Sequence, residues 1–127
     1  MITPTSVAEI ALRAAELLLS LVFVLGGLAT LRDPRPRAEQ LARFHLPFAT
    51  LLVRLNAVVM IVAGAALTLN VVPGLASAAL AAVLVPTTVM GHAFWLTQGA
   101  ARQEQLAHFL KNMAVIGGLV ALTLAVG

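Results

Sequence analysis

The chain has 127 residues, of which 61% are hydrophobic and 10% are charged, and its formal net charge is +3. A soluble domain usually carries roughly 25% charged residues, so this composition excludes a soluble globule and indicates a surface that faces lipid. The sequence contains no cysteine, which excludes disulfides, thiolate metal ligands and iron–sulfur clusters within this chain.

Four hydrophobic stretches are long enough to cross a bilayer as helices, because about 20 residues at ~1.5 Å each span the hydrocarbon core. We expect these spans at residues 10–31, 48–72, 75–96 and 106–126. No secretory cleavage pattern follows the first span, so we expect it to remain in the mature protein. The predicted fold is an all-α membrane protein, with a single four-helix transmembrane bundle over residues 1–127.

The segment between the first two spans, residues 32–48, is expected to lie at the membrane interface. Pro34 and Pro36 interrupt a helix. The residues that follow them form an amphipathic pattern, and we expect Leu41, Phe44 and Leu46 to face lipid.

The second and third spans are predicted to form a helical hairpin, since Pro73-Gly74 is a strong turn signal between them. Pro86 lies inside the third span and should kink it. Small residues would allow helices to cross closely, namely Gly26, Gly27, Ala63, Gly64, Gly117 and Gly118. The spacing of Gly117 and Ala121 suits either packing within the chain or a homo-oligomer.

The basic residues predict the orientation. Loop 32–48 carries Arg32, Arg35, Arg37 and Arg43, and loop 97–111 carries Arg102 and Lys111. Because cytoplasmic loops are enriched in Lys and Arg, we expect both loops in the cytoplasm of a bacterial-type membrane and both termini outside. Arg13, near the opposite end, is a counter-signal. Basic residues in loops contact lipid headgroups, so no nucleic-acid partner is expected.

Polar residues near the cytoplasmic ends of spans two to four are candidates for a ligand site. They are Arg54, Asn56, His92, Trp95, His108, Lys111 and Asn112. A few convergent polar groups on an apolar pocket between helices suit a ligand such as a quinone headgroup, and histidine can exchange a proton with its carbonyl oxygen.

Each of these residues also has a plain structural explanation. Arg54 and Lys111 suit snorkelling to headgroups, and Trp95 suits an interface anchor. His108 lies at the water boundary, and Asn112 suits a cap or a bond between helices. A second polar pair, Arg13 and Glu16, fits either a self-neutralising ion pair or a polar access route to a site.

No motif supports a resident metal or cofactor. His45, His92 and His108 lack the spacing of a metal site, and the histidines are not arranged as facing haem ligands. The sequence also lacks nucleotide-binding and hydrolase motifs, so no self-contained catalytic centre is expected.

The segment from Gly91 to Leu122 resembles the C-terminal signature of the DoxX family, with His92, Phe94-Trp95 and the run Phe109 to Asn112. Gly26-Gly27 in the first span and "FHLPFATLLV" before the second are also similar, so the resemblance extends over nearly the whole chain. It implies a four-helix membrane protein. Some relatives are described as small subunits of a quinol oxidase or of a thiosulfate:quinone oxidoreductase. Many relatives carry a carboxylate where this chain has Asn56, so a proton relay at that position is in doubt.

Three functions agree with these observations. The leading hypothesis is a quinone-linked membrane subunit that serves or anchors a partner oxidoreductase, which would supply the electrons. The second is a structural or assembly protein without a ligand. The third is a carrier of a small lipophilic molecule, although four short helices leave little space for alternating access.

Overall fold

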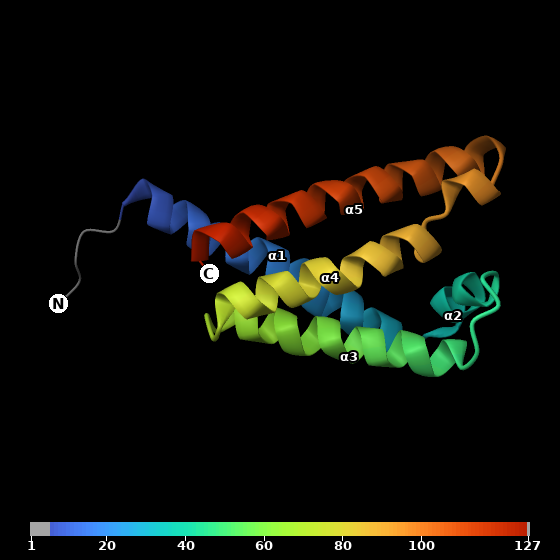
Figure 1. Cartoon of the computed structure of the whole chain (residues 1–127), viewed down its shortest axis with the longest axis horizontal. Helices are drawn as coiled ribbons and strands as arrows, with labels where there is room; N and C mark the ends of the chain where they lie inside the picture. Colours follow the sequence, from blue (N-terminus) through green and yellow to red (C-terminus); the bar gives the residue numbers. More distant parts are fainter. Residues whose placement is uncertain (1–5, 127) are drawn as a thin grey trace.

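The structure is a computed structural model that describes residues 6–126. Over these residues the chain forms five α-helices and one short 3₁₀ helix (Figure 1). They are α1 (Val7–Arg32), α2 (Arg35–Ala42), α3 (Ala49–Thr68), α4 (Pro73–Gly91), η1 (Phe94–Leu96) and α5 (Gly99–Val126).

Four of the helices in this part of the chain are long and apolar enough to cross a bilayer. The candidate spans are Val7–Arg32, Ala49–Thr68, Pro73–Leu96 and Gly99–Val126. The protein is therefore a multi-pass membrane protein, and the predicted four-helix bundle is confirmed. The segment predicted at the interface after the first span contains the short helix α2.

Local sequence explains where the helices begin. Ser6 caps α1, because its hydroxyl oxygen accepts a hydrogen bond from the backbone N–H of Glu9 at 3.1 Å. Pro73 is the first residue of α4, where its missing N–H costs nothing and its fixed φ suits a helix. The turn of the hairpin consequently precedes Pro73 and contains Asn70 and Val72, both with positive φ.

The boundaries of the last two spans differ from the sequence prediction. α4 ends at Gly91, and the chain then turns through η1 before α5 begins at Gly99 instead of residue 106. The polarity of residues 99–105 suggested a loop, but Ala, Arg, Gln and Glu are good helix formers. With 28 residues, α5 is about 42 Å long, so its polar first turns extend beyond the hydrocarbon core.

The core lies where α1, α3, α4 and α5 face one another. It is built around Phe23, Leu67, Leu80, Leu84, Leu119 and Leu122. Seen from the side, α2, η1 and the start of α5 lie at one end of the bundle (Figure 1). The α3–α4 turn, the start of α1 and the end of α5 lie at the other end. The two basic loops thus share one end, as the sequence predicted.

Only some of the small residues mark close helix crossings. A Cβ atom at Gly27 would lie 2.7 Å from Cγ1 of Ile61 and 2.9 Å from the carbonyl oxygen of Ala57 in α3. A Cβ atom at Gly64 in α3 would likewise lie 2.8 Å from Cγ2 of Val24 in α1. A Cβ atom added at Gly117 or Gly118, in contrast, would meet no side chain and no other helix within 4 Å among the described residues, so neither glycine serves a crossing within this part of the chain.

The α1–α3 crossing predicts a contrast between two glycines. Gly27→Ala should destabilise the fold by about 1–3 kcal/mol, because a backbone oxygen of α3 opposes the added methyl group. Gly118→Ala, the matched control on α5, should leave stability unchanged or raise it slightly through helix propensity. Thermal unfolding in detergent measures both variants, and equal melting temperatures for the two would contradict the crossing.

Candidate functional site

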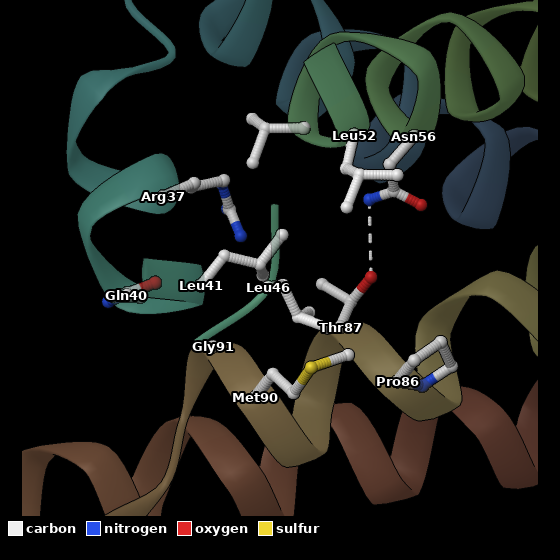
Figure 2. A pocket seen from close by; sticks show the side chains of 11 residues that line it. Arg37, Gln40, Leu41, Leu46, Leu52, Asn56, Pro86, Thr87, Met90 and Gly91 are labelled. Atoms are coloured by element: carbon white, nitrogen blue, oxygen red, sulfur yellow. Dashed lines mark hydrogen bonds between the residues drawn. The ribbon is translucent and has the colours of Figure 1, made fainter. Parts of the chain in front are cut away.

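A pocket of about 190 Å³ lies at the end of the bundle that carries the basic loops, between α2, α3 and α4. Figure 2 shows the side chains that surround it. It is lined by Arg37, Gln40, Leu41, Leu46, Leu52, Val53, Asn56, Pro86, Thr87, Met90 and Gly91. Most of this lining is apolar, and its polar groups come from all three helices.

Helix α2 forms one wall of the pocket because the chain folds back after α1. Pro34 and Ala38 are buried, which fixes α2 against the bundle. His45 and Phe48 have left-handed backbone conformations, with φ of 57° and 56°, and they reverse the chain into α3. Leu41 and Leu46 therefore line the pocket and are half-buried, while Phe44 is also half-buried and lies outside it; that all three face lipid stays a prediction.

Two polar side chains bridge α3 and α4 beside the pocket. The Asn56 amide donates a hydrogen bond to the hydroxyl oxygen of Thr87 at 3.2 Å (Figure 2). The Thr87 hydroxyl in turn donates to the carbonyl oxygen of Val83 at 2.7 Å. Pro86 lies next to this bond, inside α4, as the sequence predicted. The bridge fixes the relative position of α3 and α4 where the pocket opens.

Arg37 brings a positive charge into the pocket. Figure 2 shows its side chain pointing from α2 toward the apolar residues opposite. Burial lowers the pKa of the Arg37 guanidinium from its ordinary value. The sequence analysis counted Arg37 only as a topology signal. The spacing of Arg37, Gln40 and Leu41, three and four residues apart, places them on one helix face and was the available clue.

His92 and His108 come together next to this pocket. His92 follows Gly91, a pocket residue, and its Nδ1–H donates to Oε1 of Gln105 at 2.9 Å. The His92 and His108 rings stack with centroids 5.1 Å apart. Because the Gln105 amide oxygen can only accept, Nδ1 of His92 is the donor in this hydrogen bond. The sequence missed Gln105, which orients this ring from α5.

Trp95 belongs to an aromatic cluster formed by residues of η1 and α5. Its ring lies edge-on to Phe94 and Phe109, with centroids 5.3 and 6.1 Å away. The Arg102 guanidinium lies 5.9 Å from the centre of the Phe94 ring. Trp95 is 46% exposed and does not line the pocket, which suits an aromatic anchor at the membrane interface.

The other candidate residues do not converge on the pocket. Arg54 and Lys111 are exposed, as expected for side chains that reach lipid headgroups. Asn112 is partly exposed on α5. Of the seven residues in the predicted site, Asn56 lines the pocket and His92 and His108 adjoin it.

Arg13 and Glu16 lie at the opposite end of the bundle, where they form the expected ion pair. Nη1 of Arg13 donates to Oε2 of Glu16 at 2.7 Å and to the carbonyl oxygen of Leu67 at 3.1 Å. Nη2 donates to the carbonyl oxygen of Thr68. Leu67 and Thr68 lie at the end of α3, where carbonyl oxygens lack the partners of the helix interior. Arg13 donates to both, and the Leu67 oxygen also accepts from the backbone N–H of Asn70 at 3.2 Å.

No three histidine, aspartate or glutamate side chains within residues 6–126 are grouped so that they could hold a metal ion. His45 is exposed in the loop before α3, whereas the other two histidines lie together beside η1.

Comparison with known proteins identifies the family. The sequence profile of the DoxX family matches residues 11–93, which is more than half of the chain. The chain therefore belongs to the DoxX family. The match includes the pocket and ends beside His92, so most of the segment from Gly91 to Leu122 lies beyond it. Neither the curated proteins nor the solved structures gave a significant match.

The Arg13 contacts predict a large effect on stability. Arg13→Ala should lower the free energy of unfolding by about 1–3 kcal/mol, because it leaves the buried Glu16 carboxylate without its ion-pair partner and removes a donor to the carbonyl oxygens of Leu67 and Thr68. Arg54→Ala removes the same charge from an exposed site and should have little effect. The double variant Arg13→Ala/Glu16→Leu should recover part of the loss. Thermal unfolding in detergent checks all three, and a strictly additive double variant would contradict the coupling.

Proposed function

We propose that this DoxX family protein is a small membrane subunit that binds a quinone headgroup in the α2–α3–α4 pocket and serves or anchors a partner oxidoreductase. The observation that carries the proposal is an apolar pocket into which Arg37, Gln40, Asn56 and Thr87 bring polar groups. Ligand sites between bundle helices have this combination of an apolar body and a few polar contacts.

The size of the pocket suits one ring of a quinone. A cavity of about 150 Å³ is enough to hold benzene, and this pocket measures about 190 Å³ and is not closed. A substituted quinone ring would fill it, and the isoprenoid tail would leave through the opening. Leu41, Leu52 and Pro86 supply apolar contacts for the ring faces.

The polar groups match the oxygens of the ligand. The Arg37 guanidinium has N–H donors for a quinone carbonyl oxygen, and the Asn56 carbonyl oxygen is an acceptor for a quinol hydroxyl. His92 follows the pocket wall at Gly91 and offers an imidazole ring that can donate or accept a proton. These residues bind and orient the headgroup, and His92 supports proton exchange.

The electrons that reduce the quinone are expected to come from a partner subunit, because the sequence has no thiolate for an iron–sulfur centre and no dinucleotide-binding motif.

The surface of α5 suits this partner best. In its most apolar stretch 11% of residues are buried within the chain, compared with 28–33% in the other three spans. Gly117 and Gly118 lie on its open side, where a transmembrane helix of the partner can approach closely.

Quinone binding predicts a change in thermal stability. A short-chain ubiquinone analogue should raise the melting temperature of the purified protein, because a ligand at 100 times its Kd stabilises the fold by about 2.7 kcal/mol. Leu52→Trp fills the pocket and should abolish the shift. Leu51→Trp is the control, since the neighbouring Leu51 is exposed and lies outside the pocket. An unshifted wild type, or equal shifts in both variants, would refute the site.

The cytoplasmic position of the pocket rests on the orientation of the basic loops, which single cysteines can test in this cysteine-free chain. Leu69→Cys places a thiol at the exposed α3–α4 turn, and Gln103→Cys places one on the exposed start of α5. An impermeant thiol reagent should label the first in intact cells and the second only after lysis. The reverse pattern would place the pocket on the outer side.

A further inference from the structure

We propose that the pocket selects a quinoid headgroup that carries an ionised oxygen, and that Arg37 is the residue that pairs with it. The inference rests on the proposed quinone site and specifies the class of its ligand. A hydroxyquinone that is ionised at neutral pH belongs to this class, whereas a quinone without an acidic hydroxyl does not.

The first argument is the charge of the pocket. Arg37 is the one charged residue among the eleven that line it, and no carboxylate lies in the wall. Burying a charge in apolar surroundings is unfavourable unless the charge is paired. The Arg37 guanidinium is half-buried and forms no ion pair within residues 6–126, and this partial burial lowers its pKa from the ordinary value. A ligand with a negative charge would supply the missing counter-ion.

The second argument is that the protein places each of its carboxylates elsewhere. The sequence has five acidic residues, and all five lie within the described part of the chain. Asp33 pairs with Arg35 at 2.9 Å, and both are exposed. Glu16 pairs with Arg13 at the far end of the bundle. The other three are exposed and form no ion pair within residues 6–126, namely Glu9, Glu39 and Glu104.

The third argument is the chemistry of the guanidinium. It is planar, keeps its charge at any physiological pH and presents several N–H donors in a fixed fork, which suits an oxyanion next to a carbonyl oxygen on the same ring. Apolar neighbours such as Leu41, Leu46 and Val53 exclude water and strengthen such a pair. The charge on Arg37 therefore distinguishes ligands that differ little in shape.

Two naphthoquinones of similar size, one ionised and one neutral, test whether the pocket prefers a charged headgroup. Lawsone is a hydroxynaphthoquinone ionised at neutral pH, and menadione carries a methyl group in place of that hydroxyl and is neutral. Both are titrated by calorimetry against the full chain in nanodiscs of phosphatidylcholine, with empty nanodiscs as the blank. Because a hydrogen bond to a charged group contributes about 1.5–3 kcal/mol, the wild type should bind lawsone at least about tenfold more tightly than menadione.

Variants of Arg37 then show whether this residue is responsible for the preference for the ionised ligand. Arg37→Gln keeps N–H donors and removes the charge, so it should lose the preference for lawsone while still binding menadione. Arg37→Lys keeps the charge without the fork and should retain part of the preference. Arg54→Gln is the matched control, since Arg54 is exposed outside the pocket, and it should behave as the wild type.

The outcomes separate this proposal from the one on which it rests. Equal binding of both compounds by the wild type, or an unchanged preference in Arg37→Gln, would overturn the charge selection and leave the quinone site intact. If neither compound binds, both proposals are overturned. A preference that disappears when phosphatidylglycerol is added to the nanodiscs would assign Arg37 to a lipid phosphate and also overturn the selection.

Discussion

A bilayer core offers no hydrogen-bond partners, and this constraint shapes every polar feature of the protein. At one end, Arg13 neutralises Glu16 and binds the last carbonyl groups of α3. In the middle, apolar and small side chains fill the bundle. Along the helices, hydroxyl groups such as those of Ser20, Thr30 and Thr68 donate to carbonyl oxygens within their own helices. A further group of polar side chains, which includes Arg37, Asn56 and His92, lies at the end with the basic loops, where headgroups and water can solvate them.

The candidate site follows from the way this end is closed. α2 folds back over the α3–α4 hairpin, and the Asn56–Thr87 bridge keeps the two long helices in register beside it. The result is a pocket in a membrane protein whose apolar wall is interrupted by one half-buried cation. The His92–His108 pair and Gln105 adjoin the pocket through Gly91, so two imidazole rings lie near the Arg37 guanidinium. This combination is the basis for the quinone proposal.

The fold could be predicted from the sequence because transmembrane helices depend mainly on length and hydropathy, and the Pro73 turn and the Arg13–Glu16 pair depend on residues close in sequence. The site could be predicted only in part. Asn56 and His92 stood out as polar residues in apolar spans, whereas Arg37 resembled the other arginines of its loop. The position of Arg37, Leu41 and Leu46 in the pocket wall depends on α2 packing against α3 and α4. That contact is tertiary, and no local pattern specifies it. The helical start of α5 was missed because polarity outweighed helix propensity.

The most direct test of this account is to map where a quinone touches the protein. An azidoquinone is irradiated with the full chain in nanodiscs, and the modified residues are identified by mass spectrometry, with an excess of unlabelled quinone as competitor. The account predicts competable labelling of Leu41, Leu46 and Met90 in the pocket wall. Labelling confined to the lipid-facing surface, at residues such as Leu25 and Leu124, and insensitive to the competitor, would contradict it.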